Sequence, residues 1–166
     1  MSEDKKSILF VCTGNTCRSP MAEFLFRHRL GRDAAWQALS AGVIAVPDCP
    51  ASQEAHEVLD ELGIDASEHR SRPLSPELVE QATLIAAMTQ GHRNELLARF
   101  PEVADKVRLL TEFGTGGDMQ EIADPVGQSV GVYRYTRDQI DRAMADLILY
   151  IRERWGLESP PETKGT

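Results

Sequence analysis

The chain has 166 residues, 42% hydrophobic and 27% charged, a composition typical of one soluble globular domain. Its formal net charge is −8, so nucleic acid and membrane surfaces are not expected partners, and any anion site must be built locally. Three cysteines do not indicate a disulfide framework, and no apolar run is long enough for a signal peptide or a bilayer span, so we expect a cytoplasmic protein and a monomer.

Apolar runs and turn signals predict strands that alternate with helices along the chain. The predicted strands cover 7–11, 36–42, 83–88 and 107–110. The predicted helices cover 20–30, 51–62, 76–81, a segment that ends at Phe100, and 140–151. Ser19-Pro20 indicates the start of the first helix, with Ser19 as its N-cap.

This alternation, without an internal repeat, predicts an α/β three-layer sandwich. We expect a four-stranded parallel sheet with helices on both faces, one domain over 1–166, and flexible tails at 1–6 and 159–166. In such folds ligands bind beyond the carboxyl ends of the strands. Residues 12–18, which follow the first strand, lie at that edge.

The stretch 12–18 begins with a thiol and ends with a guanidinium. Backbone N–H groups of such a loop can form an anion-binding nest, and the following helix adds positive potential there. The same field favours the Cys12 thiolate, a nucleophile, and Arg18 can bind two oxygens of a tetrahedral anion. An isolated Cys is more often a small buried hydrophobe, but that alternative does not explain the neighbouring residues.

Three neighbours fit the same geometry. Gly14 permits positive φ and close backbone approach, and Asn15 tolerates a left-handed conformation. Ser19 can donate a hydrogen bond to the Cys12 sulfur. A reaction at this loop also needs an acid for the leaving group, and Asp124, followed by Pro125 in a turn, is the candidate, although Asp-Pro by itself is a common turn.

Together these residues resemble the low-molecular-weight protein tyrosine phosphatase family. The loop VCTGNTCRSPMAE is similar to the family's pattern of Cys, five residues, Arg and Ser-Pro. The resemblance continues through SAGV at 40–43, GIDASEHRSRPL at 63–74, AMT at 87–89 and the distal Asp-Pro. The whole string most resembles the bacterial protein-arginine phosphatase branch.

The resemblance implies a role for each matching residue. Cys12 would form a phosphocysteine, and Asp124 would protonate the leaving group and then activate water. The implied phosphate-binding loop is Thr13, Gly14, Asn15, Thr16, Cys17 and Arg18. Asn15, Ser19, Ser40 and His69 would form the supporting hydrogen-bond network, although a loop histidine such as His69 is more commonly solvated.

Some cysteines and histidines have weaker or no implied roles. Cys17 matches a family position and could form a reversible disulfide with Cys12, or it could be a buried small thiol. No role is assigned to Cys49, His28, His56 or His92.

Substrate preference is read from Thr16 and Val126. Tyrosine-directed relatives resemble one another in having an aliphatic residue at the position of Thr16 and often aromatic residues after the Asp-Pro, where this chain has Val126 and Gly127. A threonine hydroxyl can hydrogen-bond a guanidinium or orient water. The resemblance therefore favours phosphoarginine in proteins as substrate, with phosphotyrosine as the alternative.

Two other functions fit the sequence less well. The arsenate-reducing branch uses two further downstream cysteines, and no Cys follows Cys49 here. A redox-sensing or phosphate-binding module would not need Asp124. We expect no metal and no cofactor, because the His, Cys and Asp residues lack ligand spacing.

Overall fold

The computed structural model describes residues 5–31, 35–114 and 121–156. Its centre is a parallel sheet of four strands in the order β2-β1-β3-β4. The strands are β1 (Lys6–Cys12), β2 (Trp36–Gly42), β3 (Leu84–Ala87) and β4 (Val107–Leu109). The predicted fold class is confirmed, and the apolar strand at the N-terminus occupies a central position, between β2 and β3.

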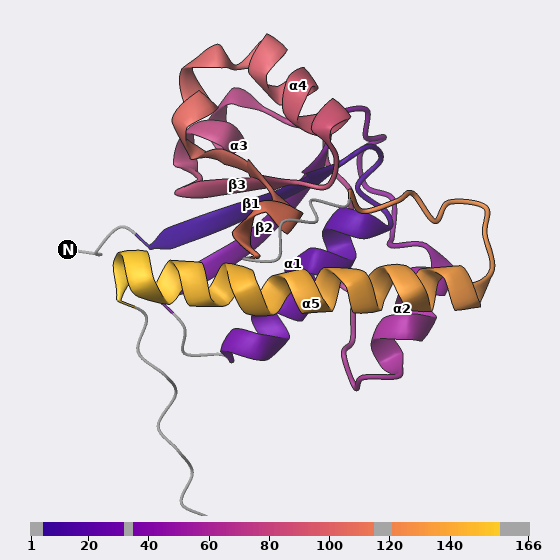
Figure 1. Cartoon of the computed structure of the whole chain (residues 1–166). Helices are drawn as coiled ribbons and strands as arrows, with labels where there is room; N and C mark the ends of the chain where they lie inside the picture. The colour runs from indigo at the N-terminus through magenta and orange to yellow at the C-terminus, as the bar shows by residue number, and fades with distance from the viewer. Residues whose placement is uncertain (1–4, 32–34, 115–120, 157–166) are drawn as a thin grey trace, which may run out of the picture.

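Helices cover both faces of this sheet. The α-helices are α1 (Arg18–Leu30), α2 (Gln53–Asp60), α3 (Pro76–Gln81), α4 (Gln90–Arg99) and α5 (Val130–Trp155). Two 3₁₀ helices, η1 (Pro101–Lys106) and η2 (Leu110–Phe113), flank β4. Figure 1 shows α1 and α5 on one side of the sheet, with α3 and α4 on the other.

Strand β1 supplies side chains to both layers of the core. Ile8 and Phe10 belong to the cluster that includes α1 and α5, whereas Leu9 and Val11 pack with α3 and α4. All four side chains have no exposed surface. Because successive strand residues point to opposite faces, an unbroken apolar run is what a strand covered on both faces requires.

The observed boundaries differ from the predicted ones in a few places. Strand β1 already begins at Lys6, and α5 is much longer than the predicted 140–151. It begins after Ser129, which caps it by accepting a hydrogen bond from Val132 N–H, and it continues to Trp155. The predicted tails, apart from Lys5 and Lys6, and the Gly-rich loop after Gly114 lie outside the described residues. No helix in the described ranges has the length and apolar character needed to cross a membrane.

Candidate active site

The loop 12–18 joins the end of β1 to α1, and the helix does not begin where the sequence predicted. Its first residue is Arg18 and its N-cap is Cys17, so the prediction of Ser19 as N-cap is wrong. The Ser19 hydroxyl is engaged elsewhere: it lies 2.9 Å from Cys12 Sγ and accepts a hydrogen bond of 2.8 Å from Asn15 Nδ2. A hydroxyl held against the thiol is placed to stabilise a thiolate.

Asn15 makes the sharp turn of the loop. Its φ is 58°, the left-handed conformation predicted for it. Gly14, which permits positive φ, does not use that freedom: among the described glycines, positive φ occurs at Gly31, Gly63, Gly127 and Gly156. The Asn15 side chain fixes the turn, since its Nδ2 donates to Ser19 and its Oδ1 accepts from Arg72 N–H at 3.0 Å.

The carbonyl groups of the loop bond outward, to groups in other segments or in the first turn of α1. The Cys12 and Thr13 carbonyls accept from the N–H groups of Val43 and Ile44. The Asn15 carbonyl accepts from His69 Nε2, the Thr16 carbonyl from Ser52 N–H, and the Cys17 carbonyl from Met21 N–H. In a trans peptide the N–H points opposite to the C=O. The N–H groups of the following residues therefore face the interior of the loop, the arrangement that an anion-binding nest requires.

The buried Arg18 side chain closes the loop, with 3% of its surface exposed. Its Nη1 donates to the Ile122 carbonyl at 2.9 Å, and its Nη2 donates to Thr13 Oγ1 at 3.2 Å. Asp124 Oδ2 lies 3.6 Å from the same Nη2. The structure thus brings the predicted cation and the predicted acid together, although 106 positions separate them in the chain.

The segment that carries Asp124 is tied to the end of β3. Ile122 is fully buried, and its N–H donates to the Met88 carbonyl at 3.0 Å. Gln90 N–H donates to Glu121 Oε1. Asp124 itself is half exposed, and its Oδ1 accepts from Val126 N–H, so the carboxyl group is oriented but open to a ligand.

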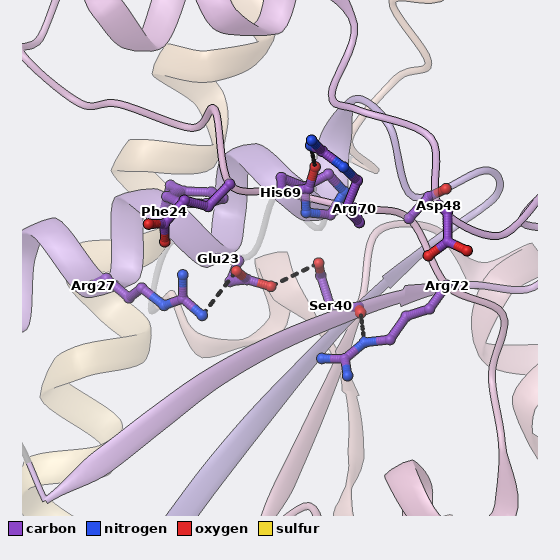
Figure 2. A pocket seen from close by; sticks show the side chains of 10 residues that line it. Glu23, Phe24, Arg27, Ser40, Asp48, His69, Arg70 and Arg72 are labelled. Carbon is purple, nitrogen blue, oxygen red and sulfur yellow. Dashed lines mark hydrogen bonds and ion pairs between the residues drawn. The ribbon is translucent and has the colours of Figure 1, made fainter.

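Ser40 does not act on the loop as predicted. Its hydroxyl donates to Glu23 Oε1 at 2.8 Å, and Glu23 also pairs with Arg27. Figure 2 shows these side chains in a cavity of about 400 Å³ beside His69. The link from Ser40 to the loop is through the backbone, because its carbonyl accepts from Arg72 Nε, and Arg72 N–H reaches Asn15.

His69 contacts the loop directly. Its Nε2 lies 2.7 Å from the Asn15 carbonyl, and the ring is buried. Burial lowers the pKa of His69, while the hydrogen bond to Asn15 acts in the opposite direction. A neutral imidazole with its proton on Nε2 donates to that carbonyl and so holds the turn from outside.

Cys17 is buried away from solvent beside α5. Its Sγ lies 3.2 Å from the Tyr133 hydroxyl and 3.5 Å from Ser52 Oγ. Burial, followed by the contact with Cys17, raises the pKa of Tyr133 to about 12. Of the two predicted specificity residues, Thr16 is partly buried in the loop and Val126 is 59% exposed next to Asp124.

Gly42, at the end of β2, lies against the loop. An added Cβ at this position would lie 2.5 Å from the Thr13 carbonyl oxygen and 3.0 Å from Asn15 N. Both contacts are with backbone atoms, which cannot rotate away.

Sequence reasoning missed two contributors to the site. The Ile122 carbonyl holds Arg18, and His92, to which no role was assigned, lies 2.8 Å from Thr13 Oγ1. A backbone carbonyl leaves no trace in residue type. His92 and Thr13 are 79 positions apart in the chain, so the only sign of this contact in the sequence was the position of His92 just after the AMT segment.

The chemistry available at this site is narrow. Within residues 5–31, 35–114 and 121–156, no group of three or more His, Cys, Asp or Glu side chains is placed to hold a metal ion. Inward N–H groups and Arg18 can bind a tetrahedral anion. Cys12 begins the same loop, with its Sγ against the Ser19 hydroxyl, and Asp124 can exchange a proton with the group that leaves or enters. On such a fold, this combination defines the class of thiol-dependent phosphatases.

The chain belongs to the low-molecular-weight phosphotyrosine protein phosphatase family, whose model matches residues 7–155. It is 46% identical over 134 residues to a protein-arginine-phosphatase of Geobacillus stearothermophilus, covering 81% of this chain and 88% of the relative. It is 42% identical over 147 residues to a protein-arginine-phosphatase of Bacillus subtilis, covering 88% and 97%. The protein is therefore a hydrolase of this family.

Solved structures agree with this assignment. The YwlE arginine phosphatase from Geobacillus stearothermophilus superimposes with a TM-score of 0.82 at 42% identity, covering 89% of this chain and 94% of that one. A YwlE arginine phosphatase described as a C7S mutant with a phosphorylated active-site serine gives a TM-score of 0.85 at 40% identity, covering 92% and 99%.

Proposed function

We propose that the protein removes phosphoryl groups from phosphoarginine in proteins, through a phosphocysteine at Cys12. The observation that carries this proposal is the convergence of Cys12, Arg18 and Asp124 on one loop whose N–H groups face inward. The phosphorylated serine at the active site of the YwlE variant supports a covalent phosphoenzyme.

In the first step the Cys12 thiolate attacks phosphorus. The S–P bond forms as the P–N bond of phosphoarginine breaks, and Asp124 gives its proton to the departing nitrogen. Arg18 and the loop N–H groups bind the three non-bridging oxygens, whose charge they stabilise in the transition state. The Ser19 hydroxyl, 2.9 Å from Cys12 Sγ, stabilises the thiolate before attack.

In the second step a water molecule attacks the phosphocysteine. Asp124, now a carboxylate, accepts a proton from that water, the O–P bond forms and the S–P bond breaks. Inorganic phosphate leaves, and the Cys12 thiolate is regenerated. The half-exposed position of Asp124 is compatible with both proton transfers, since the water must reach it from solvent.

Phosphoarginine is favoured over phosphotyrosine by the residues around the opening. Val126 and Gly127 follow the Asp-Pro and provide no aromatic wall for a phenol ring, and Tyr133 is buried against Cys17, so it cannot supply one. Asp124 can serve both as proton donor and as an anion facing a guanidinium. The names of the two bacterial relatives agree with this preference.

The decisive experiment measures turnover of phosphoarginine and phosphotyrosine peptides side by side. Cys12→Ser and Asp124→Ala should each lose most of the activity, by about 10³-fold or more for the nucleophile and about 10²-fold for the acid. Full activity in both variants would contradict the mechanism.

Thr16→Ile tests the substrate preference separately. We expect it to lower kcat/KM for phosphoarginine relative to phosphotyrosine by about tenfold, because the hydroxyl that can contact a guanidinium or water is replaced by an apolar face. An unchanged ratio would reject Thr16 as the specificity residue and leave the family assignment intact.

The proposal includes a single-domain monomer in the cytoplasm. Cys12, Cys17 and Cys49 are all free, as in proteins of reducing compartments. The net charge of −8 favours a monomeric, soluble state. Light scattering after size exclusion, at concentrations up to those of the assay, checks the oligomeric state.

A further inference from the structure

His92 lies in the first turn of α4 with its ring between two hydroxyl groups. Its Nε2 is 2.8 Å from Thr13 Oγ1 in the phosphate-binding loop, and its Nδ1 is 3.0 Å from Thr89 Oγ1, the N-cap of α4. The side chain is buried, with 6% of its surface exposed. A buried imidazole bonded at both nitrogens has a fixed ring orientation.

The hydrogen bonds around Thr13 have a defined direction. Arg18 Nη2 donates to Thr13 Oγ1, since a guanidinium has no acceptor. The Thr13 proton is then free to be donated to His92 Nε2, which leaves Nδ1–H to donate to Thr89 Oγ1. The neutral ring that this requires agrees with the pKa of His92, which burial and the nearby charge of Arg18 lower to about 4 against the opposing effects of Asp124 and Glu121.

Both anchors of Arg18 lead to the same part of the fold, the junction of β3 and α4. Arg18 Nη2 bonds to the Thr13 hydroxyl, which bonds to His92, which in turn bonds to Thr89. Arg18 Nη1 bonds to the carbonyl of Ile122, and the N–H of Ile122 bonds to the Met88 carbonyl. The catalytic loop follows β1, whereas the hydrogen bonds that hold Arg18 lead to the end of the neighbouring strand β3. Two of the five guanidinium N–H donors are used in this support, and Asp124 Oδ2 lies 3.6 Å from Nη2.

We propose that His92 is a positioning residue: through the Thr13 hydroxyl it fixes the orientation in which Arg18 binds the phosphoryl group. This proposal rests on the proposed function, because it concerns the same site. Without the ring nitrogen at Thr13, the hydroxyl can rotate and the guanidinium loses one of its two fixed partners. The loss acts on phosphoryl binding and on the transition state alike, since Arg18 contacts both.

Two conservative variants separate the two nitrogens of His92. His92→Gln places an amide near the position of Nε2 and keeps the contact with Thr13, whereas His92→Asn places one near Nδ1 and keeps the cap contact with Thr89. We expect His92→Asn to lower kcat/KM by about 5- to 30-fold and to weaken binding of inorganic phosphate similarly, as loss of one hydrogen bond to a charged network implies. His92→Gln should stay within about threefold of wild type.

A double-mutant cycle distinguishes positioning from simple packing. Thr13→Val removes the hydroxyl while keeping the shape of the side chain, so adding His92→Asn to it should cost almost nothing further. If His92 only stabilised α4, the two effects would add. His28→Asn, an exposed histidine of α1, is the matched control and should leave kcat/KM unchanged.

The readouts are kcat and KM on the phosphopeptide, calorimetric affinity for inorganic phosphate, and the midpoint of thermal unfolding for each variant. Wild-type phosphate affinity and kcat/KM in His92→Asn, or additive losses in the cycle, would overturn the proposal. A wild-type protein that binds phosphate without hydrolysing any phosphopeptide would contradict the proposed function instead, and the phosphate affinities would still decide the role of His92.

Discussion

Asn15 connects three parts of the site from one position. Its amide bonds to Ser19, its side-chain oxygen to Arg72 and its backbone carbonyl to His69, while its φ of 58° makes the turn. Glycine would tolerate that φ but has no side chain to form these hydrogen bonds. Alanine would neither tolerate the φ well nor form the bonds.

Replacing Asn15 should therefore separate backbone strain from hydrogen bonding. Asn15→Ala is expected to lower the unfolding midpoint by several degrees and kcat/KM by about 10- to 100-fold, since it adds about 1 kcal/mol of strain to the loss of two hydrogen bonds. Asn15→Gly should recover part of the stability but not the activity. Equal activity of Asn15→Gly and wild type would show that the side-chain bonds do not matter.

The activity should depend on pH through the protonation of Asp124 and of Cys12. Turnover requires a protonated Asp124 together with an ionised Cys12, so kcat/KM is expected to be bell-shaped or to favour acid. In Asp124→Asn the fall toward alkaline pH should disappear, at a much lower rate throughout. A wild-type profile that is flat from acid to alkaline pH would contradict the assignment of Asp124.

The residues that touch phosphorus or its leaving group could be predicted from the sequence, and so could the supporting residues Asn15, Ser19 and His69. Other residues that position the loop could not. Cys12 and Arg18 lie in one short motif, and Asp124 is followed by a proline. His92, Arg72 and Tyr133 reach the loop only through contacts that span 57 to 116 positions. Ser40 was predicted in the right neighbourhood, but its hydroxyl turned out to bond to Glu23.

At the scale of elements, α2 is held to α5 by an ion-pair cluster. Arg137 is buried, and its Nη1 donates to the Val58 carbonyl and to Glu61 Oε1. Arg134, three positions earlier in α5, is more exposed and donates to the same carboxylate. Ser52, the N-cap of α2, lies next to Cys17, so this cluster also fixes the helix that backs the catalytic loop.

Glu61→Gln should destabilise the protein near neutral pH and not in strong acid. Hydrogen bonds from Arg134 and then Arg137 lower the pKa of Glu61 to about 2, from an ordinary value near 4.5. Its contribution to stability is therefore complete above about pH 4.5 and is lost as the pH falls through 2. Unfolding midpoints at several pH values check this, with Glu57→Gln on the same helix as the control; a difference that persists at pH 2 would contradict it.

Element types were predictable because the periodicity of apolar residues differs between strands and helices. The strands 36–42 and 83–88 match β2 and β3 within a residue or two. The start of α1 was misplaced because the Ser19 hydroxyl serves the thiol rather than the helix end. The 3₁₀ helices beside β4 follow from tertiary packing around a three-residue strand and have no periodic signal.

For the whole molecule, two buried histidines make the fold sensitive to acid. Burial lowers the pKa of both His69 and His92, the latter to about 4. In the unfolded chain the two histidines bind protons near pH 6.5. Stability is thus complete above that pH and falls as the pH drops toward 4, because the unfolded state binds more protons.

Denaturant midpoints measured between pH 7 and pH 4 should fall for wild type. The fall should be smaller in His92→Gln, which has no group to titrate in this window, and unchanged in His28→Gln, whose side chain is exposed. Parallel curves for wild type and His92→Gln would show that His92 does not contribute to acid sensitivity.

Gly42 has a consequence for how members of this family diverge. A Cβ there would meet the backbone of Thr13 and Asn15, so even alanine must displace the loop while every catalytic side chain remains in the sequence. A homologous chain that keeps the Cys, five residues, Arg pattern and the distal Asp but has a larger residue at this position is expected to be a pseudoenzyme. Gene duplication followed by one substitution on β2, outside the motif, would suffice to produce one.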